Sequence, residues 1–164
     1  MRLQVFFRLV VLVVIFGFAD MVSAQKVSVE EFTLPNGMQF LLVPRTDQPN
    51  VVSAGWVARV GSVNERPGIT GISHFFEHMM FKGTDAFGKG QIDLQTSKMG
   101  GSNNAFTDTD STAYYFSMAA DRWETALEIE ASRMRGCLLD PEEFTSEKSV
   151  VLEELAMGED EPWR

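Results

Sequence analysis

The sequence predicts an α+β fold in which helices pack on a mostly antiparallel sheet. Stretches rich in β-branched or alternating apolar residues come in pairs joined by short polar turns, which is typical of antiparallel hairpins. Longer stretches with helical spacing lie between these pairs. Because most neighbouring strands are joined by hairpins, this order differs from that of a parallel, doubly wound sheet.

Five segments are predicted as strands because they are apolar or alternating and are bounded by turn residues. The turn Pro35-Asn36-Gly37 joins the first two strands in a hairpin, and the polar turn at 108–110 joins the last two. The predicted strands are residues 27–34, 38–43, 51–60, 104–107 and 112–118.

Four segments are predicted as helices from their apolar spacing and from the residues at their ends. In the third of them, Trp123, Leu127 and Met134 share one face. The fourth opens with Asp140 as a good N-cap and Pro141 at the first helical position. The predicted helices are residues 72–81, 91–99, 121–134 and 141 to about 156.

Residues 1–24 are predicted to be a signal peptide. Two arginines precede an apolar run at 9–19, and Val22-Ser23-Ala24 places small residues at −3 and −1. The apolar run is too short to span a membrane comfortably, although an uncleaved membrane anchor is the alternative. We therefore expect cleavage before Gln25, one domain from 25 to 164, and no stable membrane insertion after cleavage.

The composition excludes some partners and indicates a compartment. The net charge of −9 and the lack of a basic stripe exclude nucleic acid as a partner. Cys137 is the only cysteine, so neither an intrachain disulfide nor a thiolate metal cluster can form. Export without disulfides indicates a bacterial periplasm or the cell exterior.

The most informative stretch is 71–79, which contains the only two histidines of the chain. His74 and His78 are four residues apart, which places them within ~40° of each other on one helix face. Glu77 lies between them, so its carboxylate reaches the same side. Two neutral imidazoles on one face can bind zinc, and a neighbouring carboxylate can take a proton from a bound water. This H-x-x-E-H pattern is the inverted form of the H-E-x-x-H zinc helix.

A zinc site needs a third protein ligand, and the last helix offers several acids. Glu147 and Glu154 are two turns apart and project from nearly the same face, with apolar residues between them. The alternative is a solvated acidic face, and spacing does not choose between Glu153 and Glu154. The candidate acids are Glu142, Glu143, Glu147, Glu153 and Glu154.

These motifs and their order resemble the pitrilysin/insulinase family of zinc peptidases, which includes the mitochondrial processing peptidases. The similarity runs from about Glu31 to the end of the chain. The metal motif shows no departure from the family pattern. The segments that carry the resemblance are 34–37, 61–65, 71–84, 100–107 and 147–154.

The resemblance implies roles for individual residues. His74 and His78 match the two zinc histidines, and Glu77 matches the glutamate that activates the water. The third zinc ligand of the family falls on Glu154. Glu147 matches an acidic residue beside the site that supports the ligands.

The resemblance also implies a strand that binds substrate. Asn104, Ala105, Phe106 and Thr107 match an edge strand that pairs with an extended peptide. An open strand edge can add a peptide through main-chain hydrogen bonds. The alternative is an ordinary interior strand or a capped edge.

Family members enclose a peptide substrate between homologous domains that close like a clamshell. We therefore expect this chain to hold the first such domain, truncated at its C-terminal side. The resemblance implies that a C-terminal homologous domain or a partner subunit is missing, so this stretch alone is expected to hydrolyse peptides weakly or not at all. A non-catalytic homologue that serves as a partner or scaffold is the alternative, and the intact metal set favours the enzyme.

Overall fold

A computed structural model of the chain describes residues 27–159. The predicted signal peptide lies outside these residues. The chain divides into two compact units, one ending at Thr46 and one beginning at Asp47, and each is described by itself. Across residues 27–159, none of the helices is both long enough and apolar enough to cross a bilayer.

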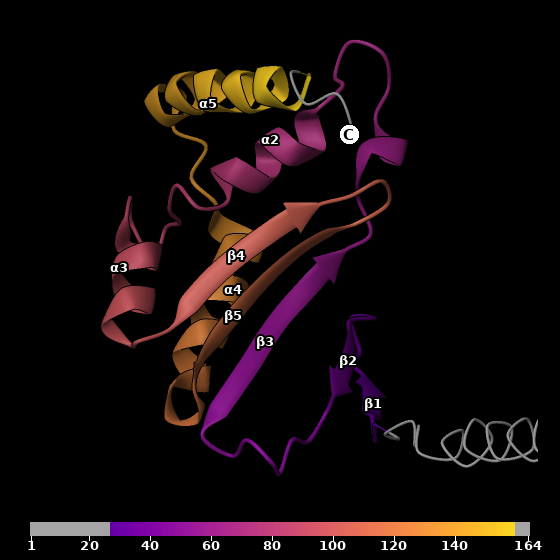
Figure 1. Cartoon of the computed structure of the whole chain (residues 1–164), viewed down its shortest axis with the longest axis vertical. Helices are drawn as coiled ribbons and strands as arrows, with labels where there is room; N and C mark the ends of the chain where they lie inside the picture. Colours follow the sequence, from indigo (N-terminus) through magenta and orange to yellow (C-terminus); the bar gives the residue numbers. More distant parts are fainter. Residues whose placement is uncertain (1–26, 160–164) are drawn as a thin grey trace, which may run out of the picture. The chain divides into compact units, whose positions relative to one another are not determined.

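The smaller unit contains a two-stranded hairpin (Figure 1). Strands β1 (Glu30–Thr33) and β2 (Gln39–Leu42) pair antiparallel. The rings of Phe32 and Phe40 stack across the pair with their centroids 4.9 Å apart. The turn reverses at Gly37, whose φ of 87° lies in the left-handed region that glycine adopts at little cost. The predicted first hairpin is confirmed.

The larger unit is built on a three-stranded antiparallel sheet in the order β3-β5-β4 (Figure 1). These strands are β3 (Val51–Ala58), β4 (Ser102–Thr107) and β5 (Thr112–Ala119). The central strand, β5, is buried along most of its length. Within the described residues β4 pairs with β5 alone, so β4 forms an edge of the sheet.

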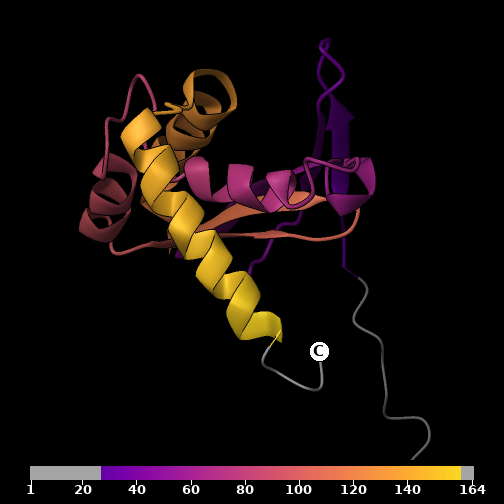
Figure 2. The ribbon, with the colours of Figure 1, turned by 90° about the horizontal axis from the view of Figure 1, so that it is seen from above.

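Helices complete the α+β arrangement that the sequence predicts. Helix α2 packs against β4 and β5 on one side and against α5 on the other (Figures 1 and 2). The α-helices are α2 (Ile72–Met79), α3 (Gln91–Lys98), α4 (Trp123–Gly136) and α5 (Pro141–Glu159), and short 3-10 turns span Ser62–Asn64 (η2) and Ala120–Arg122 (η3).

Helix α4 meets the sheet through a different face from the one that its large apolar residues mark. Trp123, Leu127 and Met134 remain exposed. The buried face of α4 includes the charged residues Glu130 and Arg133, so the spacing of apolar residues does not identify it. The core cluster of the larger unit is Ile92, Phe116, Met118, Ala126 and Ile129.

The two charged residues on this buried face are paired with each other. Arg133 Nη1 donates to Glu130 Oε1 at 3.2 Å, and Trp56 Nε1 donates to the other carboxylate oxygen at 2.6 Å. The guanidinium of Arg133 lies 4.4 Å from the centre of the Phe81 ring, just after α2. Buried charges require such partners, and Arg133 thus connects α4 with the segment that follows α2.

Candidate metal centre

A carboxylate from the preceding loop holds the N-terminus of α2. Glu65 accepts hydrogen bonds from the main-chain N–H groups of Gly71 at 2.7 Å and Ser73 at 2.9 Å. These bonds stabilise the charged form and lower the pKa of Glu65 below its ordinary value. No role for Glu65 was predicted from the sequence. An acid shortly before a helix N-terminus, where it complements the helix dipole, is the signal that identifies it.

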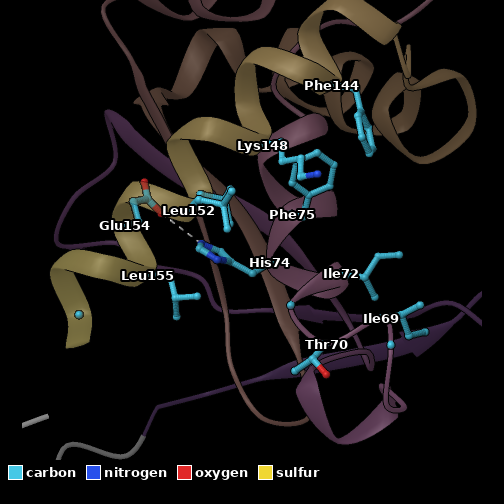
Figure 3. Close-up of a pocket in the computed structure, with 14 residues that line it drawn as sticks. Ile69, Thr70, Ile72, His74, Phe75, Phe144, Lys148, Leu152, Glu154 and Leu155 are labelled. Atoms are coloured by element: carbon cyan, nitrogen blue, oxygen red, sulfur yellow. Dashed lines mark ion pairs between the residues drawn. The ribbon is translucent and has the colours of Figure 1, made fainter.

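The two histidines of α2 face helix α5. Their Nε2 atoms lie 3.1 Å apart. Glu154 Oε2 lies 3.4 Å from Nε2 of His78 and 3.5 Å from Nε2 of His74. Figure 3 shows His74 and Glu154 pointing toward one another from the two helices. The structure thus brings together the three residues that the sequence and the resemblance indicated as metal ligands.

The spacing of these three atoms fits a tetrahedral zinc ion. Two ligand atoms that each lie ~2.0–2.1 Å from zinc at a tetrahedral angle are roughly 3.3–3.4 Å apart. The observed separations of 3.1, 3.4 and 3.5 Å bracket that value. Two imidazole nitrogens and one carboxylate are also a donor set typical of catalytic zinc. A tetrahedral zinc ion held by these three residues would have a fourth position for a water or a substrate oxygen.

Glu147 contacts Nδ1 of His78, whereas Nε2 of the same ring faces the other two candidate ligands. Its Oε1 lies 2.9 Å from Nδ1 of His78. A carboxylate only accepts hydrogen bonds, so Nδ1 carries a proton, and in the neutral imidazole Nε2 then has the lone pair that a metal ligand needs. This pairing of an outer carboxylate with a histidine is the usual support for a metal ligand. The structure therefore places Glu147 where the resemblance indicated.

Lys82 binds the other oxygen of Glu147 in an ion pair. Glu147 is only 7% exposed, and burial by itself raises its pKa. The hydrogen bonds from Lys82 and His78 and the electrostatic attraction to these residues together outweigh burial, so the pKa of Glu147 lies below its ordinary value. No role for Lys82 was predicted from the sequence, although it lies four residues after His78, a spacing at which side chains on a helix are neighbours.

Glu77 lies on the side of α2 that faces the sheet. The residue is 8% exposed, and its Oε2 accepts a hydrogen bond of 2.6 Å from the hydroxyl of Thr107 on β4. The histidines one and three residues away face α5 instead. At ~100° per residue Glu77 is roughly 60° around α2 from His74 and roughly 100° from His78, so the candidate base lies beside the candidate ligands and nearer the sheet.

The four residues of the predicted substrate strand alternate between the two faces of the sheet. Asn104 and Phe106 are exposed, whereas Ala105 and Thr107 are half-buried. Among the four, within the described part of the chain, Thr107 is the one whose side chain hydrogen-bonds to α2.

The main chain of β4 has N–H and C=O groups that point outward at the edge of the sheet. Asp108 N–H donates to the carbonyl of Ser111 at 2.8 Å, next to the turn. Antiparallel pairing alternates, so the main-chain groups of Ala105 and Thr107 point away from β5. In agreement, the N–H of Ala105 donates to its neighbour's side chain, Asn104 Oδ1, at 2.9 Å. Within the described residues this strand lies at an edge of its sheet, and its pairing with a substrate stays a prediction.

A groove of about 930 Å³ lies beside the metal-ligand candidates. It runs between α2, α5 and the loop before α2, and His74 and Glu154 contribute to its lining (Figure 3). The candidate metal ligands therefore lie beside a largely apolar surface. The apolar side chains include Ile69, Ile72, Phe75, Phe144, Leu152 and Leu155.

Known proteins are similar to this chain in sequence and in fold. The family model described as Insulinase (Peptidase family M16) matches residues 41–164. The uncharacterized zinc protease YmxG of Bacillus subtilis (strain 168) is 36% identical over 134 residues, which cover 82% of this chain and 32% of that protein. The zinc protease PqqE of Helicobacter pylori (strain ATCC 700392 / 26695) is 36% identical over 125 residues, covering 76% of this chain and 28% of that protein.

A crystal structure of a protease from Helicobacter pylori shows the same fold. Its TM-score to this chain is 0.75 at 35% sequence identity, over 78% of this chain and 31% of that one. The chain thus spans about a third of the length of the relatives that it matches. The match of the family model over most of the sequence, together with the shared fold, shows that this chain belongs to the insulinase family, peptidase family M16.

Proposed function

We propose that this chain is the zinc-binding part of a peptidase that hydrolyses peptide bonds with a metal-activated water. The observation that carries the proposal is the convergence of His74, His78 and Glu154, with Glu77 on the same helix. Relatives named zinc proteases support the choice of zinc over other divalent cations.

His74, His78 and Glu154 would hold the zinc ion. When bound there, zinc supplies Lewis-acid chemistry that acidifies a water molecule and polarises a carbonyl group. Glu77 then accepts the proton that the water gives up and returns it to the leaving nitrogen of the substrate. Glu147 keeps the proton of His78 on Nδ1, so that Nε2 remains available as a ligand.

The substrate that fits this arrangement is a peptide or an unfolded segment of a protein. The outward main-chain groups of Ala105 and Thr107 can pair with an extended chain. A substrate carbonyl at this edge would take the place of Asn104 Oδ1 on the N–H of Ala105. Thr107, next to Glu77, would bring the paired peptide close to the base.

The proposal extends to a partner that completes the site. This chain spans about a third of its relatives, so a second homologous domain or a partner subunit would supply the opposite wall of the chamber. The chain by itself would therefore bind zinc and hydrolyse peptides weakly or not at all. A non-catalytic scaffold role is the competing proposal, and the intact set of His74, Glu77, His78 and Glu154 argues against it.

Metal removal tests the proposed function. The complete protein that contains this chain is expected to cleave an unstructured peptide and to lose that activity when a chelator removes zinc. Adding about one equivalent of Zn²⁺ per site should restore cleavage, because the chain offers one such ligand set in its described part. Peptide cleavage that is insensitive to the chelator, or a purified protein that binds no zinc, would contradict the proposal.

We also propose that the protein is exported, since residues 1–24 have the pattern of a signal peptide. The mature protein is then expected to begin at Gln25 and to be found in the periplasm or outside the cell. N-terminal sequencing of protein from each cell fraction checks this. A mature chain that keeps its first residues and sediments with membranes would favour the anchor alternative.

A further inference from the structure

The candidate base is held by a residue from the strand beside it. Thr107 donates its hydroxyl proton to Glu77 Oε2 at 2.6 Å. In the described part of the chain this is the side-chain hydrogen bond that Glu77 receives. Because Glu77 is 8% exposed, little solvent competes with Thr107 for that oxygen.

We propose that Thr107 is a positioning residue, which fixes the direction of the Glu77 carboxylate and leaves Oε1 free for the attacking water. The inference rests on the proposed function and deepens it. A carboxylate at the end of a glutamate side chain has three rotatable bonds, so its direction is not set by the helix alone. A short hydrogen bond from a neighbouring element removes that freedom.

The Thr107 hydroxyl is itself held in a fixed direction. Its oxygen lies 3.3 Å from Oγ1 of Thr112, the residue opposite it on β5. Thr112 is 5% exposed and donates its own proton to the carbonyl of Val60 at 2.9 Å. The proton of Thr112 is therefore engaged elsewhere, and the proton of Thr107 goes to Glu77. Threonine is also stiff at χ1, so the donor is preorganised.

The position of Thr107 links the base to the substrate strand. Its side chain contacts Glu77, while its main-chain groups face the open edge where an extended peptide would pair. One residue would thus set the distance between the base and the bound peptide. A purely structural role, in which the bond only fastens α2 to the sheet, predicts a loss of stability without a selective loss of turnover.

The test compares Thr107→Val and Thr107→Ser in the complete, zinc-loaded protein. Valine keeps the shape but lacks the hydroxyl, and we expect kcat to fall roughly 10- to 100-fold, the cost of misplacing a reacting group by about 1 Å. KM for an unstructured peptide and the zinc content should stay at the parental values. Serine restores the donor and should restore most of kcat. Thr109→Val, in the exposed turn of the same hairpin, is the matched control and should leave kcat unchanged.

Two results would overturn the inference: parental kcat in Thr107→Val, or an equal loss in Thr107→Ser. Crystal structures of both variants give a readout that does not depend on turnover. We expect the Glu77 carboxylate to be displaced in Thr107→Val and to stay in place in Thr107→Ser, and an unmoved carboxylate in Thr107→Val overturns the assignment. If the parental protein fails to cleave peptides, the proposed function fails, while the crystallographic comparison still decides the role of Thr107.

Discussion

Replacing Glu77 with glutamine is expected to lower kcat by about 10²- to 10⁴-fold, the usual contribution of a general base. Glutamine has nearly the same shape, and its amide oxygen can still accept the hydrogen bond from Thr107. It cannot take a proton from water. Because Glu77 is not one of the three candidate ligands, the zinc content should equal that of the parent. Peptide hydrolysis and metal analysis on the same complete protein measure both quantities.

A matched control separates loss of the base from loss of any negative charge. Glu128 is an exposed acid on α4, and Glu128→Gln should keep the parental kcat. The assignment of Glu77 as the base is wrong if Glu77→Gln cleaves peptides at the parental rate. A variant that loses zinc as well would instead show that Glu77 supports the metal.

Replacing Glu154 with glutamine is expected to weaken zinc binding by more than the ~10- to 100-fold that loss of an outer-shell partner costs. Glu154 Oε2 lies within 3.5 Å of both histidine Nε2 atoms, and a neutral amide is a much poorer ligand than a carboxylate. Competition against a chelating dye at fixed pH measures the zinc Kd. Hydrolysis should fall in parallel when zinc is limiting.

Glu153→Gln is the natural comparison for this variant. Glu153 is the neighbouring acid on α5, and its side chain is exposed, whereas Glu154 is half-buried beside the histidines. We expect Glu153→Gln to bind zinc like the parent. The opposite pattern, with zinc lost in Glu153→Gln and kept in Glu154→Gln, would refute the ligand assignment.

Local geometry explains which parts of the site could be predicted from the sequence. His74, Glu77 and His78 lie on one helix, so their spacing alone brings them near one another. The hairpins and the cap at Asp140 were also predictable, since they depend on a few adjacent residues. Asp140 Oδ1 indeed accepts hydrogen bonds from the N–H groups of Glu142 and Glu143.

Contacts between distant elements were harder to predict. The choice of Glu154 over Glu153 depends on how α5 is rotated as it packs on α2, which spacing within α5 does not contain. The bond from Thr107 to Glu77 depends on the register of β4 against β5 and on the height of α2 above the sheet. The α4 face was concealed because Glu130 and Arg133 are buried as a pair.

The different contacts of Glu77 and of the two histidines have a consequence for how such proteins lose activity. A change at Glu77 would stop turnover, while His74, His78 and Glu154 would still be able to hold a zinc ion between α2 and α5. An intact pair of histidines therefore does not by itself identify an active enzyme, and Glu77 is the residue whose presence should be checked.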